Sequence, residues 1–105
     1  MIPRLGSSGA PPRGFVYLLQ SAQDGTFYVG WTTDVVRRLV EHEQGCAAYT
    51  RRKRPWRLIG VEPFPSLKAA QAHERLLKRS PRSLHSFKKR LLNQAAQSGL
   101  CQGVG

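Results

Sequence analysis

The fold of this chain is decided by two short stretches, Phe15-Val16-Tyr17-Leu18-Leu19-Gln20 and Phe27-Tyr28-Val29-Gly30-Trp31. Both are rich in aromatic and aliphatic residues of the kind that favour strands. Residues 21–26 separate them and contain Asp24-Gly25, a dipeptide typical of tight hairpin turns. The sequence therefore predicts a β-hairpin at the start of the folded region.

After the hairpin, the apolar spacing changes to that of a helix. Asp34, like the two threonines before it, is an N-cap candidate, and Gly45 ends the pattern, so we predict a helix at about residues 34–43. With about 100° per residue, Arg38 and His42 should lie together on one edge of its buried stripe. The stripe itself is expected to consist of Val35, Val36, Leu39 and Val40.

The remainder of the chain reads as a polar segment, a strand and two helices. Residues 44–55 are polar and basic and are expected to form a loop, while residues 56–64 return to strand-forming types. A helix over 67–79 follows, and Pro81 starts another helix that is expected to fray from Ala96 onward. The inner faces of these two helices are predicted to carry Ala69, Ala70, His73, Leu76 and Leu77, and then Leu84, Phe87, Leu91 and Leu92.

The order ββαβαα predicts an α+β domain with a small three-stranded antiparallel sheet flanked by helices. A chain of 105 residues has room for one such domain. We place this domain at residues 14–95. It is preceded by a Pro/Gly/Ser-rich disordered tail at 1–13 and followed by a flexible tail at 96–105.

Charge is the most informative property of the composition. Seventeen Lys and Arg against six Asp and Glu give a formal charge of +11, which attracts polyanions at long range. Nucleic acid is the leading expected partner; the alternative is a basic protein whose charge serves solubility or binds a membrane surface. The longest apolar run, residues 15–19, is far shorter than the roughly 20 residues of a membrane span, so no membrane span is expected.

The cysteines favour a reduced setting. Cys46 and Cys101 are far apart and belong to no close-spaced Cys/His set that would hold zinc. The first 14 residues lack the apolar block of a secretory signal. We therefore expect a cytoplasmic, nucleoid-associated protein.

Glu74 is the one acidic residue that invites a chemical role. It falls at the border of the inner stripe of the helix over 67–79. The other five acids have ordinary explanations in a turn, near a helix N-terminus, on a helix surface or at a strand end. Two-metal nucleases hold ions about 4 Å apart and need several carboxylates. The sequence therefore argues against a two-metal site.

The two strands of the hairpin carry motifs that resemble those of a known family. Phe15-Val16-Tyr17 and Tyr28-Val29-Gly30 are similar to the paired Gly-Ile-Tyr and Tyr-Ile-Gly motifs that define the GIY-YIG nucleases. Phe15 stands where the family name has glycine, and Val29 replaces isoleucine. Neither departure removes a catalytic group.

Three further positions extend the resemblance beyond the hairpin. Arg38 and His42 match the family's helix motif, and Glu74 matches its metal-binding glutamate. The likeness covers about residues 14–92 and is nearest to the small single-domain bacterial members, with a weaker similarity to the nuclease domain of the junction-cutting branch. It implies the GIY-YIG fold.

The resemblance also implies an activity. It implies a metal-dependent DNA endonuclease, a phosphodiester hydrolase of DNA repair or recombination that selects DNA structure rather than sequence. A single Mg²⁺ or Mn²⁺ on Glu74 would contact the scissile phosphate, and Arg38 would stabilise the charge that develops there. Tyr17, assisted by Tyr28 or His42, would activate the attacking water. Which of these three is the general base stays open.

The basic residues are expected to hold the DNA backbone without reading its sequence. They include the run Arg51-Arg52-Lys53-Arg54 and Lys78, while Gly30 would let the backbone pass close to the site. Trp56 is expected in the core. RNA is not excluded as a substrate, and cutting both strands would call for dimerisation or a partner subunit. The alternative function is a non-catalytic basic module that binds nucleic acid, but such a module has no use for a carboxylate beside the phosphate.

Overall fold

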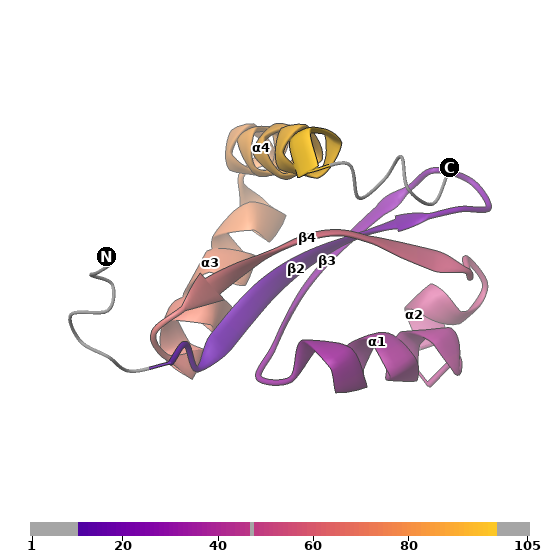
Figure 1. Cartoon of the computed structure of the whole chain (residues 1–105), viewed down its shortest axis with the longest axis horizontal. Helices are drawn as coiled ribbons and strands as arrows, with labels where there is room; N and C mark the ends of the chain where they lie inside the picture. Colours follow the sequence, from indigo (N-terminus) through magenta and orange to yellow (C-terminus); the bar gives the residue numbers. More distant parts are fainter. Residues whose placement is uncertain (1–10, 47, 99–105) are drawn as a thin grey trace.

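The computed structural model describes residues 11–46 and 48–98, which form a sheet between two layers of helices (Figure 1). Helices α3 and α4 cover one face of the sheet, and α1 and α2 lie on the other side. The α+β class and the three-stranded antiparallel sheet predicted from the sequence are confirmed. The elements are β2 (Gly14–Ser21), β3 (Phe27–Thr32), α1 (Val35–Glu43), α2 (Ala48–Arg51), β4 (Trp56–Phe64), α3 (Leu67–Arg79) and α4 (Pro81–Ser98).

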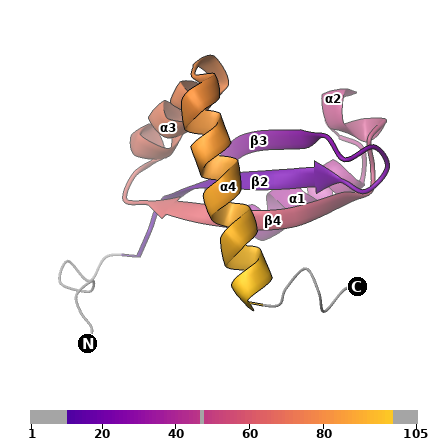
Figure 2. The ribbon, with the colours of Figure 1, turned by 90° about the horizontal axis from the view of Figure 1, so that it is seen from above.

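The sheet has the order β3-β2-β4, so the first strand of the hairpin is the central strand (Figure 2). Leu18 pairs with Val29, and both face α3 and α4. Because successive side chains point to opposite faces, Tyr17 and its partner Gly30 face the side of α1. The register therefore places both tyrosine-containing motifs on the α1 side.

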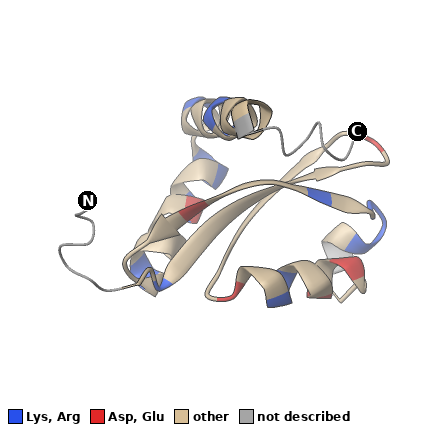
Figure 3. Cartoon of the chain, in the orientation of Figure 1, with Lys and Arg blue, Asp and Glu red and all other residues tan. Residues whose placement is uncertain are grey.

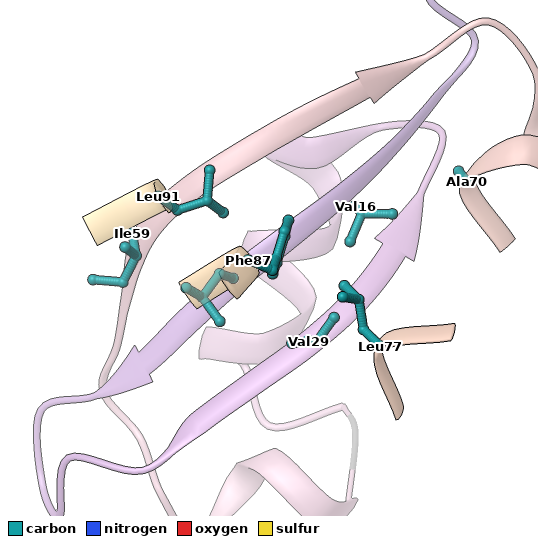
Figure 4. Close-up of a cluster of buried hydrophobic side chains, with 8 residues drawn as sticks. Val16, Val29, Ile59, Ala70, Leu77, Phe87 and Leu91 are labelled. Atoms are coloured by element: carbon teal, nitrogen blue, oxygen red, sulfur yellow. The ribbon is translucent and has the colours of Figure 1, made fainter. Parts of the chain in front are cut away.

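The apolar core lies between the sheet and the pair α3 and α4 (Figure 4). Phe87 and Leu91 of α4 and Leu77 of α3 are each at most 2% exposed. Burying such side chains stabilises the fold by about 1.5–3 kcal/mol each. The full set of buried residues in this cluster is Val16, Leu18, Val29, Ile59, Ala70, Leu77, Phe87 and Leu91.

Local signals set the ends of the elements. The hairpin turn contains Gly25 at φ +80°, a conformation that favours glycine. Asp34 caps α1 by accepting a hydrogen bond from the backbone N–H of Arg37, and Ser66 caps α3 in the same way. None of the helices within the described residues is long and apolar enough to cross a membrane.

Helix α1 turns a different face to the sheet from the one predicted. Val36 and Val40, expected in the buried stripe, are 73% and 48% exposed, whereas His42 is fully buried. Val35 and Leu39 are half-buried. The prediction was wrong because it assigned the inner face by counting aliphatic residues, while this helix buries a polar side chain that is hydrogen-bonded.

Smaller differences occur in three other places. The segment 44–55, predicted as a loop, contains the short helix α2. Helix α4 continues through Ser98, past the fraying expected at Ala96. Leu76 and Leu92, predicted on inner faces, are each 36% exposed. The predicted tails fall largely on residues 1–10 and 99–105, which lie outside the described residues.

Candidate active site

Tyr17 is the centre of a hydrogen-bonded cluster on the α1 side of the sheet. It is 1% exposed, and its hydroxyl lies 2.9 Å from Nε2 of His42. Nε of Arg38 donates to the same hydroxyl at 3.4 Å. Since Arg38 and His42 are one helical turn apart, α1 delivers both side chains to one oxygen atom.

Both ring nitrogens of His42 are engaged. Nδ1 lies 2.8 Å from Oγ1 of Thr50. Burial lowers the pKa of His42 below 6.5, and the nearby charge of Arg38 lowers it further, so the ring is neutral at pH 7. A neutral ring that donates from Nδ1 to Thr50 accepts at Nε2 from the hydroxyl of Tyr17.

Thr50 is a site residue that the sequence did not reveal. It lies in α2, inside the segment predicted as a loop, and it is fully buried. Its carbonyl accepts a hydrogen bond of 2.8 Å from Nε1 of Trp56, so Trp56 packs beside the site, outside the apolar core cluster where it was expected. A lone threonine before a basic run carries no signal for this role, because the role depends on a contact with His42.

The proton of the Tyr17 hydroxyl is held firmly. Burial raises the pKa of Tyr17 to about 12, although the hydrogen bond from Arg38 acts in the opposite direction. The charges of Tyr28 and Glu74 also raise this pKa. The side chain is therefore a neutral phenol at pH 7, and Glu74 is close enough for its charge to act on it.

Arg38 links this cluster to solvent. Its Nη1 donates to Glu41 at 2.8 Å, and this hydrogen bond is the main reason that the pKa of Arg38 is raised above its ordinary value. Arg37 also pairs with Glu41, at 3.4 Å. A hollow of about 350 Å³ lies beside Arg38, between the end of β3 and the start of α1, and its lining also includes Arg37 and the carboxylates of Asp34 and Glu41.

Helix α3 packs against the edge strand β3 and places an acid and a second cation near Tyr28. The side chain of Glu74 is 16% exposed and pairs with Nζ of Lys78 at 2.7 Å. The same Nζ lies 5.6 Å from the ring centroid of Tyr28, whose ring is 5.2 Å from that of His42 and 6.4 Å from that of Tyr17. Four of the five residues predicted for catalysis, Tyr17, Tyr28, Arg38 and His42, are thus joined by hydrogen bonds or ring packing. Glu74 is joined to this cluster through Lys78.

Residues 13–90 match the GIY-YIG catalytic domain family. The chain belongs to this family of nucleases. A UPF0213 protein of Streptococcus pneumoniae is 42% identical over 71 residues, which cover 67% of this chain and 71% of that protein. A UPF0213 protein of Nitratidesulfovibrio vulgaris is 48% identical over 68 residues, which cover 64% of this chain and 61% of that protein. Among solved structures, the solution NMR structure of the UPF0213 protein BH0048 from Bacillus halodurans matches this chain with a TM-score of 0.46 and 38% sequence identity. The match covers 72% of this chain and 82% of BH0048.

The GIY-YIG domain offers a divalent cation only a sparse protein ligand set. Among the described residues, no group of three or more His, Cys, Asp or Glu side chains is placed to hold a metal ion. A single carboxylate such as Glu74 fits Mg²⁺, which commonly keeps several waters and takes its other ligands from substrate phosphates.

Gly30 of the second GIY-YIG motif has a packing role in the structure. A Cβ atom at this position would lie 2.6 Å from Cζ of Tyr17, closer than real side chains approach. The missing side chain therefore makes room for the tyrosine ring on the neighbouring strand. The sequence predicts that Gly30 lets the backbone pass close to the site, and the geometry supplies a packing reason for a glycine at this position.

The basic run after α2 divides into two parts. Nε of Arg54 donates to the carbonyl of Arg51, and its Nη1 donates to the carbonyl of Glu43, while Lys53 pairs with Asp24 at 3.4 Å. These two cations therefore fasten the segment to α1 and to the hairpin turn. Arg51 and Arg52 line a solvent-open hollow and, within the described part of the chain, their side chains make no hydrogen bond or ion pair.

Proposed function

We propose that this protein is an endonuclease that hydrolyses phosphodiester bonds in DNA with the help of one divalent cation. The observation that carries the proposal is the position of the Tyr17 hydroxyl between a neutral His42 at 2.9 Å and a cationic Arg38 at 3.4 Å. A tyrosine that only packs needs one hydrogen-bond partner at most. Here one partner accepts a proton and the other suits a phosphate oxygen.

In the free protein, the guanidinium of Arg38 occupies the solvent side of the Tyr17 hydroxyl. Its guanidinium is shared between Tyr17 and Glu41. A phosphate diester competes with Glu41 for this guanidinium, because the planar fork of Arg binds phosphate oxygens with two hydrogen bonds. When the phosphate takes that place, Arg38 moves off Tyr17 and a water molecule reaches the hydroxyl.

The proton then passes along the buried chain of hydrogen bonds. As the water oxygen forms its bond to phosphorus, its proton moves to the oxygen of Tyr17, and the proton of Tyr17 moves to Nε2 of His42. The bond from phosphorus to the leaving oxygen breaks on the opposite side, the released alkoxide takes a proton from solvent water, and His42 then returns its proton to solvent. Thr50 accepts from Nδ1 throughout and holds the imidazolium that forms. His42 is thus the general base, and Tyr17 transmits the proton, since its pKa of about 12 opposes a resting tyrosinate.

Glu74 would hold the cation. A bound Mg²⁺ would supply positive charge to the scissile phosphate and its leaving oxygen. In the free protein, Lys78 neutralises the carboxylate of Glu74. When the cation displaces its ammonium group from Glu74, Lys78 would be placed to bind a neighbouring phosphate. Arg38 and Lys78 would thus contact phosphate from α1 and α3, on either side of the tyrosines.

The surface charge supports DNA as the substrate. Lys and Arg residues are placed along α3 and α4 and on the segment after α2 (Figure 3). Contacts from Lys and Arg to the DNA backbone neutralise phosphates and give affinity without reading bases. Together with the accessible Arg51 and Arg52, they support selection of DNA structure rather than sequence, the property that enzymes of DNA repair and recombination need.

The direct test is cleavage by the purified protein with Mg²⁺, with Mn²⁺ and with EDTA. Glu74→Gln should abolish cleavage and leave DNA affinity intact or raised, because it removes both the cation ligand and a negative charge. Glu62→Gln is the matched control, because Glu62, like Glu74, is paired with a cation, in its case Arg90. The Glu62→Gln variant should cut normally. Binding without cutting by the wild-type protein on every substrate would favour the non-catalytic module.

A further inference from the structure

We infer that a groove at the outer edge of β3 binds an unpaired nucleotide beside the scissile phosphate, so that the substrates are DNA strands with a single-stranded or opened segment. This inference rests on the proposed function and names its substrate class. It comes from a surface that shares Tyr28 and Lys78 with the catalytic cluster and extends beyond it to Phe27 and Lys88. The groove has a volume of about 670 Å³, nearly twice that of the hollow beside Arg38.

The groove is bounded by three elements. Residues 26–29 of the edge strand and its turn form one side, and Leu77 and Lys78 of α3 together with Leu84 and Lys88 of α4 form the other. Its apolar lining is flanked by two lysines. Among the described residues that line it, none is an Asp or Glu. A polyanion with an apolar face fits this lining, and an acidic floor would repel it.

Each lysine lies over an aromatic ring. Nζ of Lys88 is 4.8 Å from the ring centroid of Phe27, and Nζ of Lys78 is 5.6 Å from that of Tyr28. Phe27 and Tyr28 are both half-buried residues, and Phe27 also packs against the apolar core. Aromatic rings beside lysines are the usual elements of single-strand binding, in which bases stack and cations hold phosphates.

The arrangement selects an unpaired base. Bases in a duplex are stacked on each other and present only their edges, whereas a base that enters a groove and lies against Phe27 must leave its stack. Every base has a face for stacking, so the groove tolerates any sequence. The preference would be for DNA structure, as the proposed function requires.

The groove is continuous with the catalytic cluster. Lys78 and Tyr28 belong to both, because Lys78 pairs with Glu74 at 2.7 Å and the Tyr28 ring is 5.2 Å from that of His42. A strand whose phosphate reaches Arg38 and Glu74 therefore passes the groove with a neighbouring nucleotide. This continuity and the positive charge favour a nucleic-acid strand over a second copy of this basic protein.

Binding of oligonucleotides that carry 2-aminopurine tests the groove without cleavage, with EDTA present. The wild-type protein should quench the fluorescence of the unpaired base. Phe27→Leu, which keeps an apolar side chain against the core, and Lys88→Ala should each weaken binding of single-stranded DNA about tenfold while leaving duplex affinity nearly unchanged. Lys89→Ala is the control of equal charge outside the groove, and should weaken both substrates alike.

Cleavage of one labelled strand, presented single-stranded, opened or fully paired, separates this inference from the proposed function. Cutting that is fastest on the unpaired forms and loses that preference in Phe27→Leu supports the groove. Cutting with an unchanged preference in Phe27→Leu overturns the groove and leaves the endonuclease intact. Quenching without cutting overturns the endonuclease and keeps the groove. Concentration-dependent dimerisation through this edge, without quenching, would assign it to a second copy and contradict the inference.

Discussion

The two faces of the sheet bury different kinds of side chain. Toward α3 and α4, core residues such as Leu18 and Phe87 bury apolar atoms, whose contribution grows with the area removed from water, although Nε2 of His73 is also buried there beside Phe87. Toward α1, Tyr17, His42 and Thr50 bury polar atoms that bond to one another. A buried polar atom that loses its partner costs about 1–3 kcal/mol.

This difference teaches where the molecule tolerates change. An apolar core accepts swaps that conserve volume, whereas a hydrogen-bonded network fails when one member is missing. The apolar face makes the fold stable, and the polar face carries the chemistry that we propose. Substitutions in the polar cluster on the α1 side should therefore affect cleavage beyond their effect on stability. Substitutions of fully buried apolar residues on the other side, such as Leu18, should affect stability alone.

A pair of glycine substitutions gives the largest expected contrast. Gly30→Ala places a methyl group 2.6 Å from Cζ of the buried Tyr17, and should cost about 1–3 kcal/mol and abolish cleavage by displacing the ring. Gly60→Ala, on the apolar face, meets the flexible side chain of Leu91 at 3.2 Å. It should cost less and leave the cleavage rate of folded protein unchanged. Thermal unfolding and single-turnover cleavage measure both, and equal losses of activity would remove the contrast.

Thr50→Val sharpens the comparison within the polar face. It keeps the shape of the side chain but leaves Nδ1 of His42 without an acceptor, at a cost of about 1–3 kcal/mol. It also frees the ring to carry its proton on Nε2, so that Tyr17 loses its acceptor and cleavage falls about tenfold or more. Thr50→Ser restores the hydroxyl and should recover most of the rate. A merely structural threonine would change stability without this loss of rate at saturating protein.

The pH dependence follows from His42. Its pKa is lowered by burial from 6.5, so below about pH 6.5 the unfolded chain takes up a proton that the folded protein refuses. The free energy of unfolding should therefore fall as the pH drops through this range. Cleavage should persist below pH 6.5, since the folded ring stays neutral there, and decline once the lowered pKa is reached. His42→Gln should flatten the stability profile; an unchanged profile would contradict the assignment.

The smallest expected effect on stability comes from a substitution on the outer side of α1. Val36→Ser should change the free energy of unfolding by no more than about 0.5 kcal/mol, because Val36 is 73% exposed. Val35→Ser, at a half-buried position of the same helix, should cost more. Urea unfolding compares the two. A large loss of unfolding free energy for Val36→Ser would show that Val36 is buried, as the aliphatic spacing predicted, and would contradict its exposed position.

The sequence was informative about everything that depends on local pattern. Strand and helix bounds were predicted within one or two residues for β2, β3, β4 and α3, because turn residues, caps and apolar spacing act over a few positions. The face of α1 could not be predicted, since His42 is buried by partners 25 and 8 residues away, Tyr17 and Thr50. Thr50 was missed for the same reason.

The site residues themselves came from the resemblance rather than from physical pattern. Spacing alone placed Arg38 and His42 one turn apart, but not against Tyr17. The role of Gly30 as the space for a tyrosine ring needed the cross-strand register. Single sequences carry little information about such pairings, because a contact across a sheet is set by register and not by neighbours in the chain.

The most direct measurement is the single-turnover cleavage rate of Tyr17→Phe at saturating protein, with Tyr28→Phe as its matched control. Tyr17→Phe keeps the ring and removes only the hydroxyl that joins water to His42. The proposed mechanism predicts a rate lower by about 10² or more, with DNA affinity unchanged and a smaller effect for Tyr28→Phe. An unchanged rate for Tyr17→Phe would contradict a proton path through its hydroxyl, and a large loss confined to Tyr28→Phe would transfer the role to that tyrosine.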